Sequence, residues 1–237
     1  GCEPDKIPEI AVDNQQVVAY LEPHLEQTRS LEISDAPLAV VTTIVGQSRV
    51  LLDWQGPGGH AGGVPMSERA DPLVAAARWI AVSDAAARRP PGAPAPFGRL
   101  VVEPSVSTCI ARRTLTSLDV RHADDPTRRG LVDRLLEQAG KLAAESGVQL
   151  LIERQLDQPA TLLDAELNQR LILAAQEAGH RIEQVVCGAG HDAAVMAGRV
   201  ASGMLLIRSP GGVSHAPEEC VVTADIAAGI QTMELSL

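Results

Sequence analysis

The chain has 237 residues, 45% of them hydrophobic and 21% charged, which is a globular composition and enough for one large domain or two small ones. A formal net charge of -10 argues against binding nucleic acid or an anionic membrane, because both need clustered Lys and Arg. No apolar run approaches membrane-spanning length, and we expect no leader peptide. The four widely spaced cysteines include no C-x-x-C pair, which predicts a reduced, cytoplasmic protein without a disulfide framework.

The first predicted element is the apolar run VVAYL and the polar residues after it. If this segment is a strand, Glu22, His24 and Glu26 lie on one side of it, and Pro23 restricts it to an edge or a strand end. A helix from Asn14 to Leu25 is the alternative. A histidine flanked by carboxylates is typical of metal or acid–base sites, although a surface histidine is the simpler interpretation.

The middle of the chain predicts a separate inserted domain, residues 47–155. A glycine-dense loop there surrounds His60, either to approach a ligand closely or as a flexible hairpin. A proline-rich connector follows at Pro90–Pro96. The elements form β-α-β-β-α-β, a four-stranded antiparallel sheet with two helices on one face. The strands are predicted at Arg49–Gln55, Arg99–Glu103, Thr114–Arg121 and Val148–Glu153, and the helices at Asp71–Arg89 and Arg128–Ser146.

The last part of the chain predicts an α/β domain, formed by residues 1–46 and 156–237 together. Its strands and helices alternate along the sequence. The predicted strands are Pro37–Ile44, Gln184–Val186 and Gly203–Ile207, and the predicted helices are Asp164–Ala178, a helix starting at His191, and Thr223–Leu237.

Two loops of this domain carry candidate site residues. His191 stands at a helix N-terminus, where the helix dipole lowers a histidine pKa. The loop Ser209–Glu219 follows a buried strand and contains Gly211 and Gly212, which allow the backbone to come close to a ligand, and then His215. A polar turn that caps the last helix is the alternative for this loop.

The histidines as a group favour a site over a structural role. Five of the six lie in glycine-rich or carboxylate-rich segments, whereas a core histidine is more often found within an apolar run. The pattern does not choose between a metal site and acid–base chemistry. The five are His24, His60, His122, His191 and His215.

Several stretches together resemble the M20 peptidase superfamily, in its amidase/hydantoinase/carbamoylase branch. They occur in the order typical of that branch and cover nearly the whole chain. The stretches are AYLEPHLEQ (19–27), GGHAGGVPMSERADPLVAAAR (58–78), GRLVVEPS (98–105), LDVRH (118–122), GAGHDAAVMA (188–197) and SPGGVSHAPEE (209–219).

The resemblance implies a fold and a set of residue roles. The fold is a truncated M20-type catalytic α/β domain with an inserted ferredoxin-like (βαββαβ) dimerisation or lid domain, and hence a homodimer. His24 and His215 match ligands of a dinuclear zinc or manganese centre. His60 matches a histidine that stabilises the oxyanion in the partner's site. Arg121 matches the group that holds the substrate carboxylate, and Gln27 and His191 match further substrate contacts.

The chain also departs from this family. It begins where the family's catalytic domain is already under way, so a histidine ligand, a bridging aspartate, a glutamate ligand and the glutamate base have no counterpart. Carboxylates such as Glu22, Glu26, Asp192 or Glu218 would have to substitute. Thr108 stands where the family usually has a substrate-contacting asparagine. Other changed positions are Pro23, Thr28-Arg29 and Ala111-Arg112.

We therefore expect an amidohydrolase-like enzyme acting on a C–N bond of an amino-acid-derived carboxylate, with an N-carbamoyl, ureido or amide group. Metal-free histidine acid–base chemistry is one variant of this hypothesis. The alternative is a non-catalytic binding or regulatory subunit, or a partner of a second chain that supplies the missing half. A truncated sheet exposes apolar edges, which favours a partner chain or a tight oligomer over a lone fragment.

Overall fold

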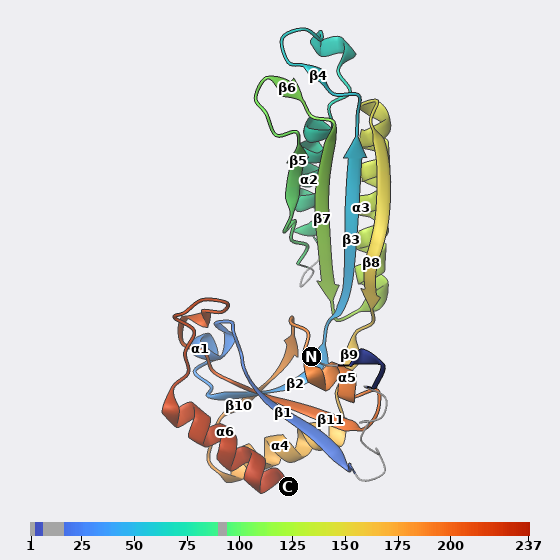
Figure 1. Cartoon of the computed structure of the whole chain (residues 1–237). Helices are drawn as coiled ribbons and strands as arrows, with labels where there is room; N and C mark the ends of the chain where they lie inside the picture. The colour runs from blue at the N-terminus through green and yellow to red at the C-terminus, as the bar shows by residue number, and fades with distance from the viewer. Residues whose placement is uncertain (1–2, 7–16, 90–93) are drawn as a thin grey trace. The chain divides into compact units, whose positions relative to one another are not determined.

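The computed structural model describes residues 3–6, 17–89 and 94–237. It divides into two compact units, a first unit of residues 1–44 and 161–237 and a second unit of residues 45–160 (Figure 1). The sequence-based prediction places the boundaries at 46/47 and 155/156. The predicted connector Pro90–Pro96 falls partly outside the described residues, as does the start of the helix considered over Asn14–Leu25.

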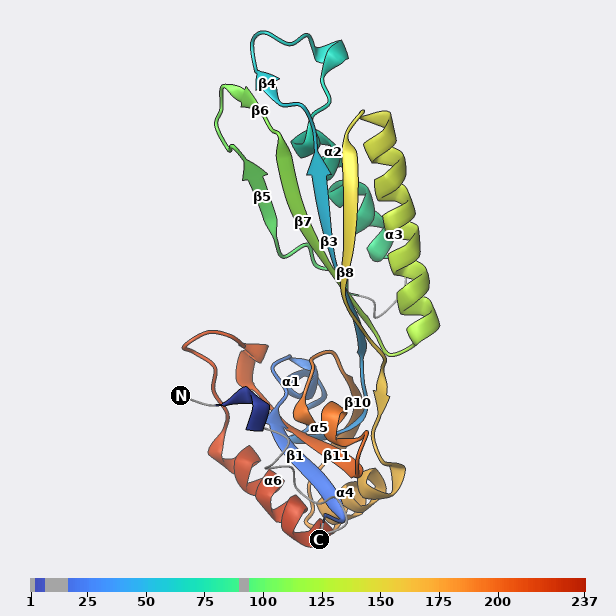
Figure 2. The same cartoon turned by 45° about the vertical axis from the view of Figure 1, so that its right-hand side comes forward.

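The second unit is a four-stranded antiparallel sheet with two helices on one face (Figure 2). Its strand order is β5-β7-β3-β8. A short pair, β4 (Gly59–His60) and β6 (Cys109–Ile110), forms a separate two-stranded sheet. The main elements are β3 (Gly46–Gln55), α2 (Pro72–Ala87), β5 (Leu100–Glu103), β7 (Arg113–His122), α3 (Asp125–Glu145) and β8 (Gln149–Gln158).

Alternation in the sequence explains the core of this unit. Val50, Leu52 and Trp54 occupy every second position of β3, so they share one face and are buried against the helices. Both helices start at an aspartate whose side chain accepts backbone N–H groups, Asp71 for α2 and Asp124 for α3, and a proline stands in the first turn.

The first unit is a mixed sheet of order β1-β11-β2-β10, in which β2 also pairs with β9. β1 runs parallel to β11, while β11 and β2 are antiparallel. The strands are β1 (Ala19–Leu25), β2 (Leu38–Ile44), β9 (Thr161–Leu162), β10 (Ile182–Cys187) and β11 (Ala201–Ile207). The helices are α1 (Ser30–Ser34), α4 (Ala165–Glu177), α5 (Asp192–Met196) and α6 (Thr223–Ser236).

Each face of this sheet has its own core. Met204 and Leu206 of β11 face the side that carries α1 and α5. Leu205 and Ile207 face the opposite side, where α4 and α6 pack. In β1 the same alternation sends Glu22 and His24 to the α5 side, while Pro23 and Leu25 line the α6 side. The side chains of β1 therefore lie in two different surroundings, one on the α5 side of the sheet and one on the α6 side.

The mixed α/β class is confirmed, and the structure decides between alternatives that the sequence left open. The segment around His24 is a strand from Ala19, not a helix, and Pro23 does lie in an edge strand. Glu26 lies directly after the end of β1, and its carboxylate accepts the N–H groups of Ser30 and Leu31 at the start of α1. The loop before α6 supplies no side-chain cap to that helix. Among the described helices, none is both long and apolar enough to cross a membrane.

Candidate functional site

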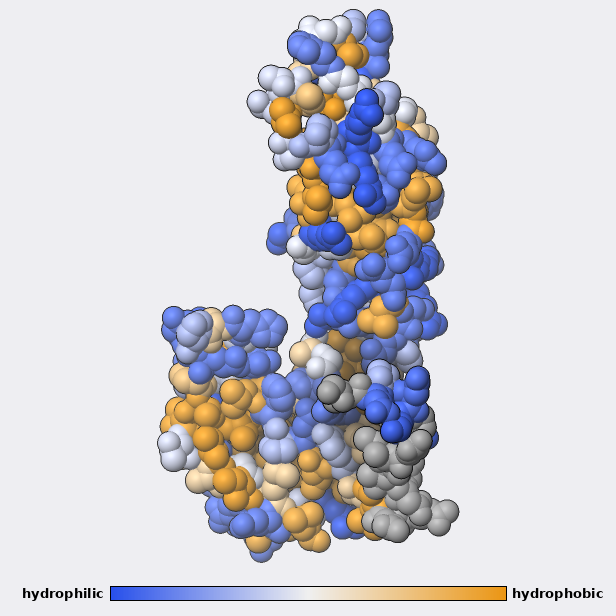
Figure 3. Space-filling model, in the orientation of Figure 1, coloured by the Kyte–Doolittle hydropathy of each residue, from blue (hydrophilic) through white to orange (hydrophobic). Residues whose placement is uncertain are grey.

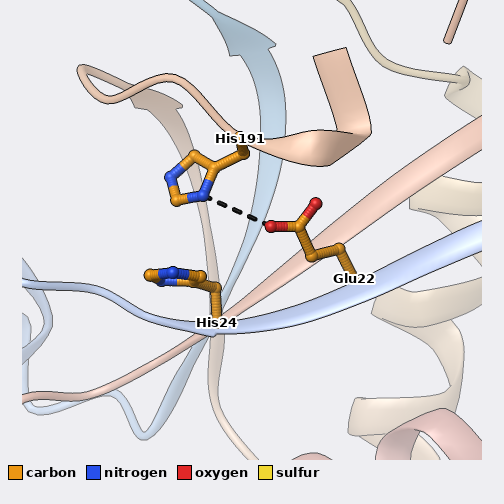
Figure 4. A group of neighbouring side chains, drawn as sticks. All are labelled: Glu22, His24 and His191. Atoms are coloured by element: carbon orange, nitrogen blue, oxygen red, sulfur yellow. Dashed lines mark ion pairs between the residues drawn. The ribbon is translucent and has the colours of Figure 1, made fainter. Parts of the chain in front are cut away.

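Glu22, His24 and His191 form a cluster on the α5 side of the first unit's sheet (Figure 4). Glu22 and His24 alternate along β1, and His191 is the residue before the first turn of α5. One ligating atom of each residue lies within 4.8 Å of those of the other two. Among the described residues this is the one group of three or more such side chains. We call it the β1–α5 cluster.

The hydrogen bonds of the β1–α5 cluster fix the orientation of its side chains. His24 donates from Nδ1 to the carbonyl oxygen of Leu25 at 2.8 Å, which leaves Nε2 with its lone pair. One oxygen of Glu22 lies 3.3 Å from Nδ1 of His191, and the other accepts the backbone N–H of Ala193 at 2.6 Å. Glu22 therefore ties β1 to the start of α5 and orients the His191 ring.

Burial and neighbouring charge decide how His191 titrates. Its side chain is 6% exposed, and that of Glu22 is 12% exposed. Burial lowers the pKa of His191 below its usual value, and the nearby His24 lowers it further, while Glu22 opposes both. The two rings meet edge to face with centroids 4.4 Å apart. The lowered pKa favours the neutral imidazole, the state in which the ring binds a metal or accepts a proton.

The donor set of the β1–α5 cluster fits one divalent cation. Two imidazoles and one carboxylate are the ligands that zinc takes in catalytic sites with an open position. The hydrogen bond from His24 to a backbone carbonyl is of the kind that fixes the tautomer of a metal-bound histidine. The described residues offer no second such group, so they do not complete a dinuclear centre.

The loop after β11 packs against the segment after β1. Gln27, with φ of 59°, donates its backbone N–H to the Ser209 hydroxyl at 3.2 Å and its side-chain amide to Glu219 at 2.6 Å. Gly212 has φ of 63°, and a Cβ there would stand 2.6 Å from the carbonyl carbon of Thr28. The glycine thus permits a backbone approach of this loop to the Gln27 segment.

His215 lies on this same loop, exposed and with φ of 56°. It is not a member of the β1–α5 cluster. Its role as a metal ligand stays a prediction, and the structure instead groups His191 with His24. The spacing in the sequence could not decide this, because both histidines follow a strand of the same sheet.

His60 and Thr108 lie close together in the second unit. β4 and β6 pair so that His60 stands opposite Cys109, and Ala61 donates its N–H to the Thr108 carbonyl at 2.9 Å. The exposed His60 ring accepts the N–H of Gly62 at 3.1 Å. Their roles as oxyanion and substrate contacts stay predictions.

Arg121, the candidate carboxylate-binding residue, already contacts a carboxylate of its own strand. Its guanidinium donates to both oxygens of Asp119 at 3.2 Å, and Gln47 and Arg49 contact the same aspartate. Arg121 is thus held in one orientation on β7, with a quarter of its side chain exposed.

A groove on the α6 side of β1 was not predicted from the sequence. Its volume is about 520 Å³, and His24, Gln27 and Glu219 are among the residues that line it. The apolar part includes Ile226, Ile230 and Met233, spaced four and three residues apart on α6. This spacing in the sequence could have indicated a helix face that lines a groove, but a helix face buried in a core has the same spacing.

The comparisons with known proteins agree on one family. The family described as Peptidase family M20/M25/M40 matches residues 5–237. The chain is 34% identical to an N-carbamoyl-L-amino acid amidohydrolase of Geobacillus stearothermophilus, over 98% of this chain and 57% of that protein. It is 32% identical to allantoate deiminase 1 of Glycine max, over 93% of this chain and 52% of that protein. The chain thus spans about half the length of the curated relatives it matches.

Solved structures show the same relationship. The structure of AtUAH in complex with (S)-hydroxyglycine superposes with a TM-score of 0.91 at 26% identity, covering 99% of this chain and 56% of that one. An amidase of the hydantoinase/carbamoylase family from Burkholderia multivorans gives a TM-score of 0.84 at 28% identity, covering 92% of this chain and 54% of that one. Both units therefore have counterparts in proteins nearly twice as long.

Proposed function

The chain belongs to peptidase family M20/M25/M40, and on that basis we propose that it is the site-bearing part of an amidohydrolase. The reaction is hydrolysis of a C–N bond in an amino-acid-derived carboxylate with an N-carbamoyl, ureido or amide group. The relatives named for N-carbamoyl-L-amino acids and for allantoate support this substrate class. The solved relative that binds (S)-hydroxyglycine supports a small amino-acid-like ligand.

The observation that carries the proposal is the β1–α5 cluster. Its two imidazoles and one carboxylate would hold zinc or manganese, and the bound ion would polarise the scissile carbonyl and lower the pKa of an attached water. Glu22 would keep His191 oriented, and the bond from His24 to a backbone carbonyl would keep its Nε2 directed at the ion. His215 is a further candidate ligand.

The substrate contacts are proposed from the same residues that the sequence analysis selected. Gln27, held by Glu219, and the backbone of Gly211 and Gly212 would bind the substrate beside the β1–α5 cluster. Arg121 would hold the substrate carboxylate, for which a planar guanidinium is suited. We interpret the second unit as the ferredoxin-like dimerisation or lid domain, which would bring His60 and Thr108 to a site in a homodimer.

The remaining ligands and the general base are proposed to come from polypeptide outside these 237 residues. The relatives carry nearly half of their length beyond the part that this chain matches. A hydrolase with two metals needs ligands for both ions and a base for the attacking water. The catalytic site is therefore composite, and the chain alone is expected to bind metal but to turn over slowly or not at all.

Activity measurements test this proposal. We would assay an N-carbamoyl-L-amino acid and allantoate with added Zn²⁺ or Mn²⁺, for the chain alone and together with the unmatched segment of the Geobacillus relative. Turnover that requires both polypeptides and is abolished by a chelator is expected. The His24→Ala variant should lose this activity, while His180→Ala, which changes a partly buried histidine bonded to Gln231 and outside the β1–α5 cluster, should keep it.

The outcomes separate the alternatives. Turnover that resists the chelator but is lost in His24→Ala would support metal-free histidine acid–base chemistry instead. Absence of turnover under every condition, with ligand binding intact, would support the non-catalytic subunit and overturn the enzyme proposal.

A further inference from the structure

A cavity lies on the open face of the second unit's sheet, the face away from α2 and α3, which is toward the viewer in Figure 1. Its volume is about 390 Å³, in the range of sites for small molecules. Val50 and Leu118 are buried on the helix side. Because side chains alternate along a strand, Arg49 of β3 and both Ser117 and Asp119 of β7 face the open side. Figure 3 shows hydrophilic side chains over much of the lower part of this unit.

The edge segment beside β7 is irregular where it lines this cavity. Ser117 donates its backbone N–H to the carbonyl of Arg99 at 3.1 Å, and Asp119 donates to the carbonyl of Pro96 at 3.2 Å. The edge segment therefore has one more residue than β7 between these two bonds. The extra length bends the chain at Gly98, which lines the cavity together with Pro96 and Arg99.

The strand on the other side, β8, is irregular at the same level of the sheet. Arg49 pairs with Leu156 and the next residue, Val50, pairs with Arg154, so Gln155 is an extra residue in β8. Gln155 is exposed and lines the cavity. Extra residues of this kind redirect side chains and are frequent beside functional sites. Both flanks of the cavity thus depart from regular pairing.

Positive charge is in excess in this cavity, although the whole chain has a net charge of -10. Among the residues that line it, Asp119 is the one acidic group, beside the guanidiniums of Arg49 and Arg99. Arg49 donates to Asp119 from Nε at 3.1 Å, and its terminal nitrogens make no hydrogen bond to the described residues. The Arg99 side chain has no ion pair with any described residue. Arg121, outside the cavity, contacts the same aspartate.

This arrangement suits a small anion. A guanidinium offers a planar fork of donors that matches the oxygens of a carboxylate or a phosphate. We propose that the cavity binds a small organic molecule through such an oxyanion group. Arg99 and the terminal nitrogens of Arg49 would contact the oxyanion, while the Ser117 hydroxyl and the Gln155 amide would contact other polar groups of the molecule. The proposal does not depend on the proposed function.

Calorimetric titration of the whole chain tests the proposal. The probes are succinate and inorganic phosphate at constant ionic strength, with chloride as the reference anion. We expect saturable one-to-one binding of succinate or phosphate, and the tighter of the two identifies the oxyanion. In amide NMR spectra of the wild-type chain, the signals of Ser117 and Gln155 should shift as the ligand binds, which locates it without any substitution.

Three variants that each remove one positive charge locate the contact. Arg99→Gln and Arg49→Gln should each weaken binding about tenfold, because each removes a charged donor from the cavity. Arg154→Gln is the matched control. The Arg154 side chain is 51% exposed, as is that of Arg49, but it pairs with Asp133 of α3 and does not line the cavity, so binding should be unchanged.

The proposal is overturned if neither probe binds saturably, or if the Ser117 and Gln155 signals stay in place while a probe binds. It is also overturned if Arg154→Gln weakens binding as much as Arg99→Gln, since the probes then respond only to overall charge. A loss of binding in Arg121→Gln with full binding in Arg99→Gln would place the anion at Arg121 instead and would equally overturn it.

Discussion

Gly211 and Gly212 both have a left-handed backbone, but only one of them faces a close neighbour. Their φ angles are 69° and 63°. A Cβ on Gly211 would meet nothing nearer than 3.7 Å, whereas one on Gly212 would stand 2.6 Å from Thr28. Substitutions at these two positions can therefore distinguish the free-energy cost of a left-handed backbone from the cost of a steric clash.

Alanine at each glycine measures these two costs. Gly211→Ala should lower the free energy of unfolding by about 1 kcal/mol, the cost of a left-handed conformation for a residue with a Cβ. Gly212→Ala should lower it by about 2–4 kcal/mol, because the clash with Thr28 adds to that cost. Urea unfolding of both variants checks the difference, and equal losses would show that the loop moves away from Thr28 freely.

The residues of the site were predictable by type but not by grouping. Resemblance and context pointed to His24, His191 and His215 alike, since each lies in a segment rich in glycine or carboxylate. Which of them meet depends on the path of α5 and of the loop after β11. Glu22 determines part of this grouping, because its carboxylate accepts the N–H of Ala193 and holds His191 against β1. This contact joins residues far apart in the sequence, so no local sequence pattern predicts it.

At the scale of elements, α3 is joined to the sheet of the second unit by a buried charge. The Arg128 side chain is fully buried, and it donates to Asp125 at 3.0 Å, to Asp157 at 2.6 Å and to the Ser48 hydroxyl. Arg129 reaches the same Asp157 at 3.2 Å with half of its side chain exposed. Arg128 and Arg129 thus contact the same carboxylate, but the first side chain is fully buried and the second is half exposed.

Substitution of these two arginines should give very different results. Arg128→Ala leaves Asp125 and Asp157 without their buried partner and should cost about 3–5 kcal/mol of unfolding free energy. Arg129→Ala should cost less than about 1 kcal/mol, as expected for an exposed pair. Chemical denaturation of the two variants is the measurement, and similar losses would contradict a structural role specific to Arg128.

Asp53 on β3 gives the second unit a dependence on pH. Hydrogen bonds from Arg113, at 2.8 and 3.0 Å, hold the pKa of Asp53 below its usual value, and burial opposes them. A carboxyl whose pKa is lowered by folding stabilises the folded state above its unfolded pKa of about 3.9. That stabilisation is lost as the pH falls through the lowered pKa of the folded state.

The Asp53→Asn variant should therefore lose less stability than the wild type between pH 6 and pH 3. The comparison is made from urea midpoints at the two pH values. Asp133→Asn is the control, because Asp133 and its partner Arg154 are both more than half exposed. An unchanged pH dependence in Asp53→Asn would show that the Arg113 pair contributes nothing to folding.

The elements themselves were largely readable from the sequence. Runs such as Leu38–Ile44 and the helical spacing of α2 and α3 located the strands and helices. β8 is the clearest miss, predicted to end at Glu153 but continuing to Gln158 through polar residues. Its last residues pair with Gln47, Ser48 and Arg49 of β3, so a tertiary pairing extends the strand where local hydrophobicity does not.

For the whole molecule, the net charge is -10, and among the described strands β1 lies at an edge of the first unit's sheet, beside the apolar groove. The groove could not be predicted from the sequence, since Ile226, Ile230 and Met233 have the spacing of a buried helix face. Only the strand order shows that the wall beside them is an edge.

The central claim is that Glu22, His24 and His191 act together as a metal site, and zinc binding tests it most directly. A competition titration against a chromophoric chelator should give one equivalent of bound Zn²⁺ for the wild type and for His180→Ala. Affinity should be lost in His24→Ala and reduced about 10- to 100-fold in Glu22→Gln, because that carboxylate binds the ion or orients His191. Equal zinc affinity in all four proteins, or none in the wild type, would contradict the claim.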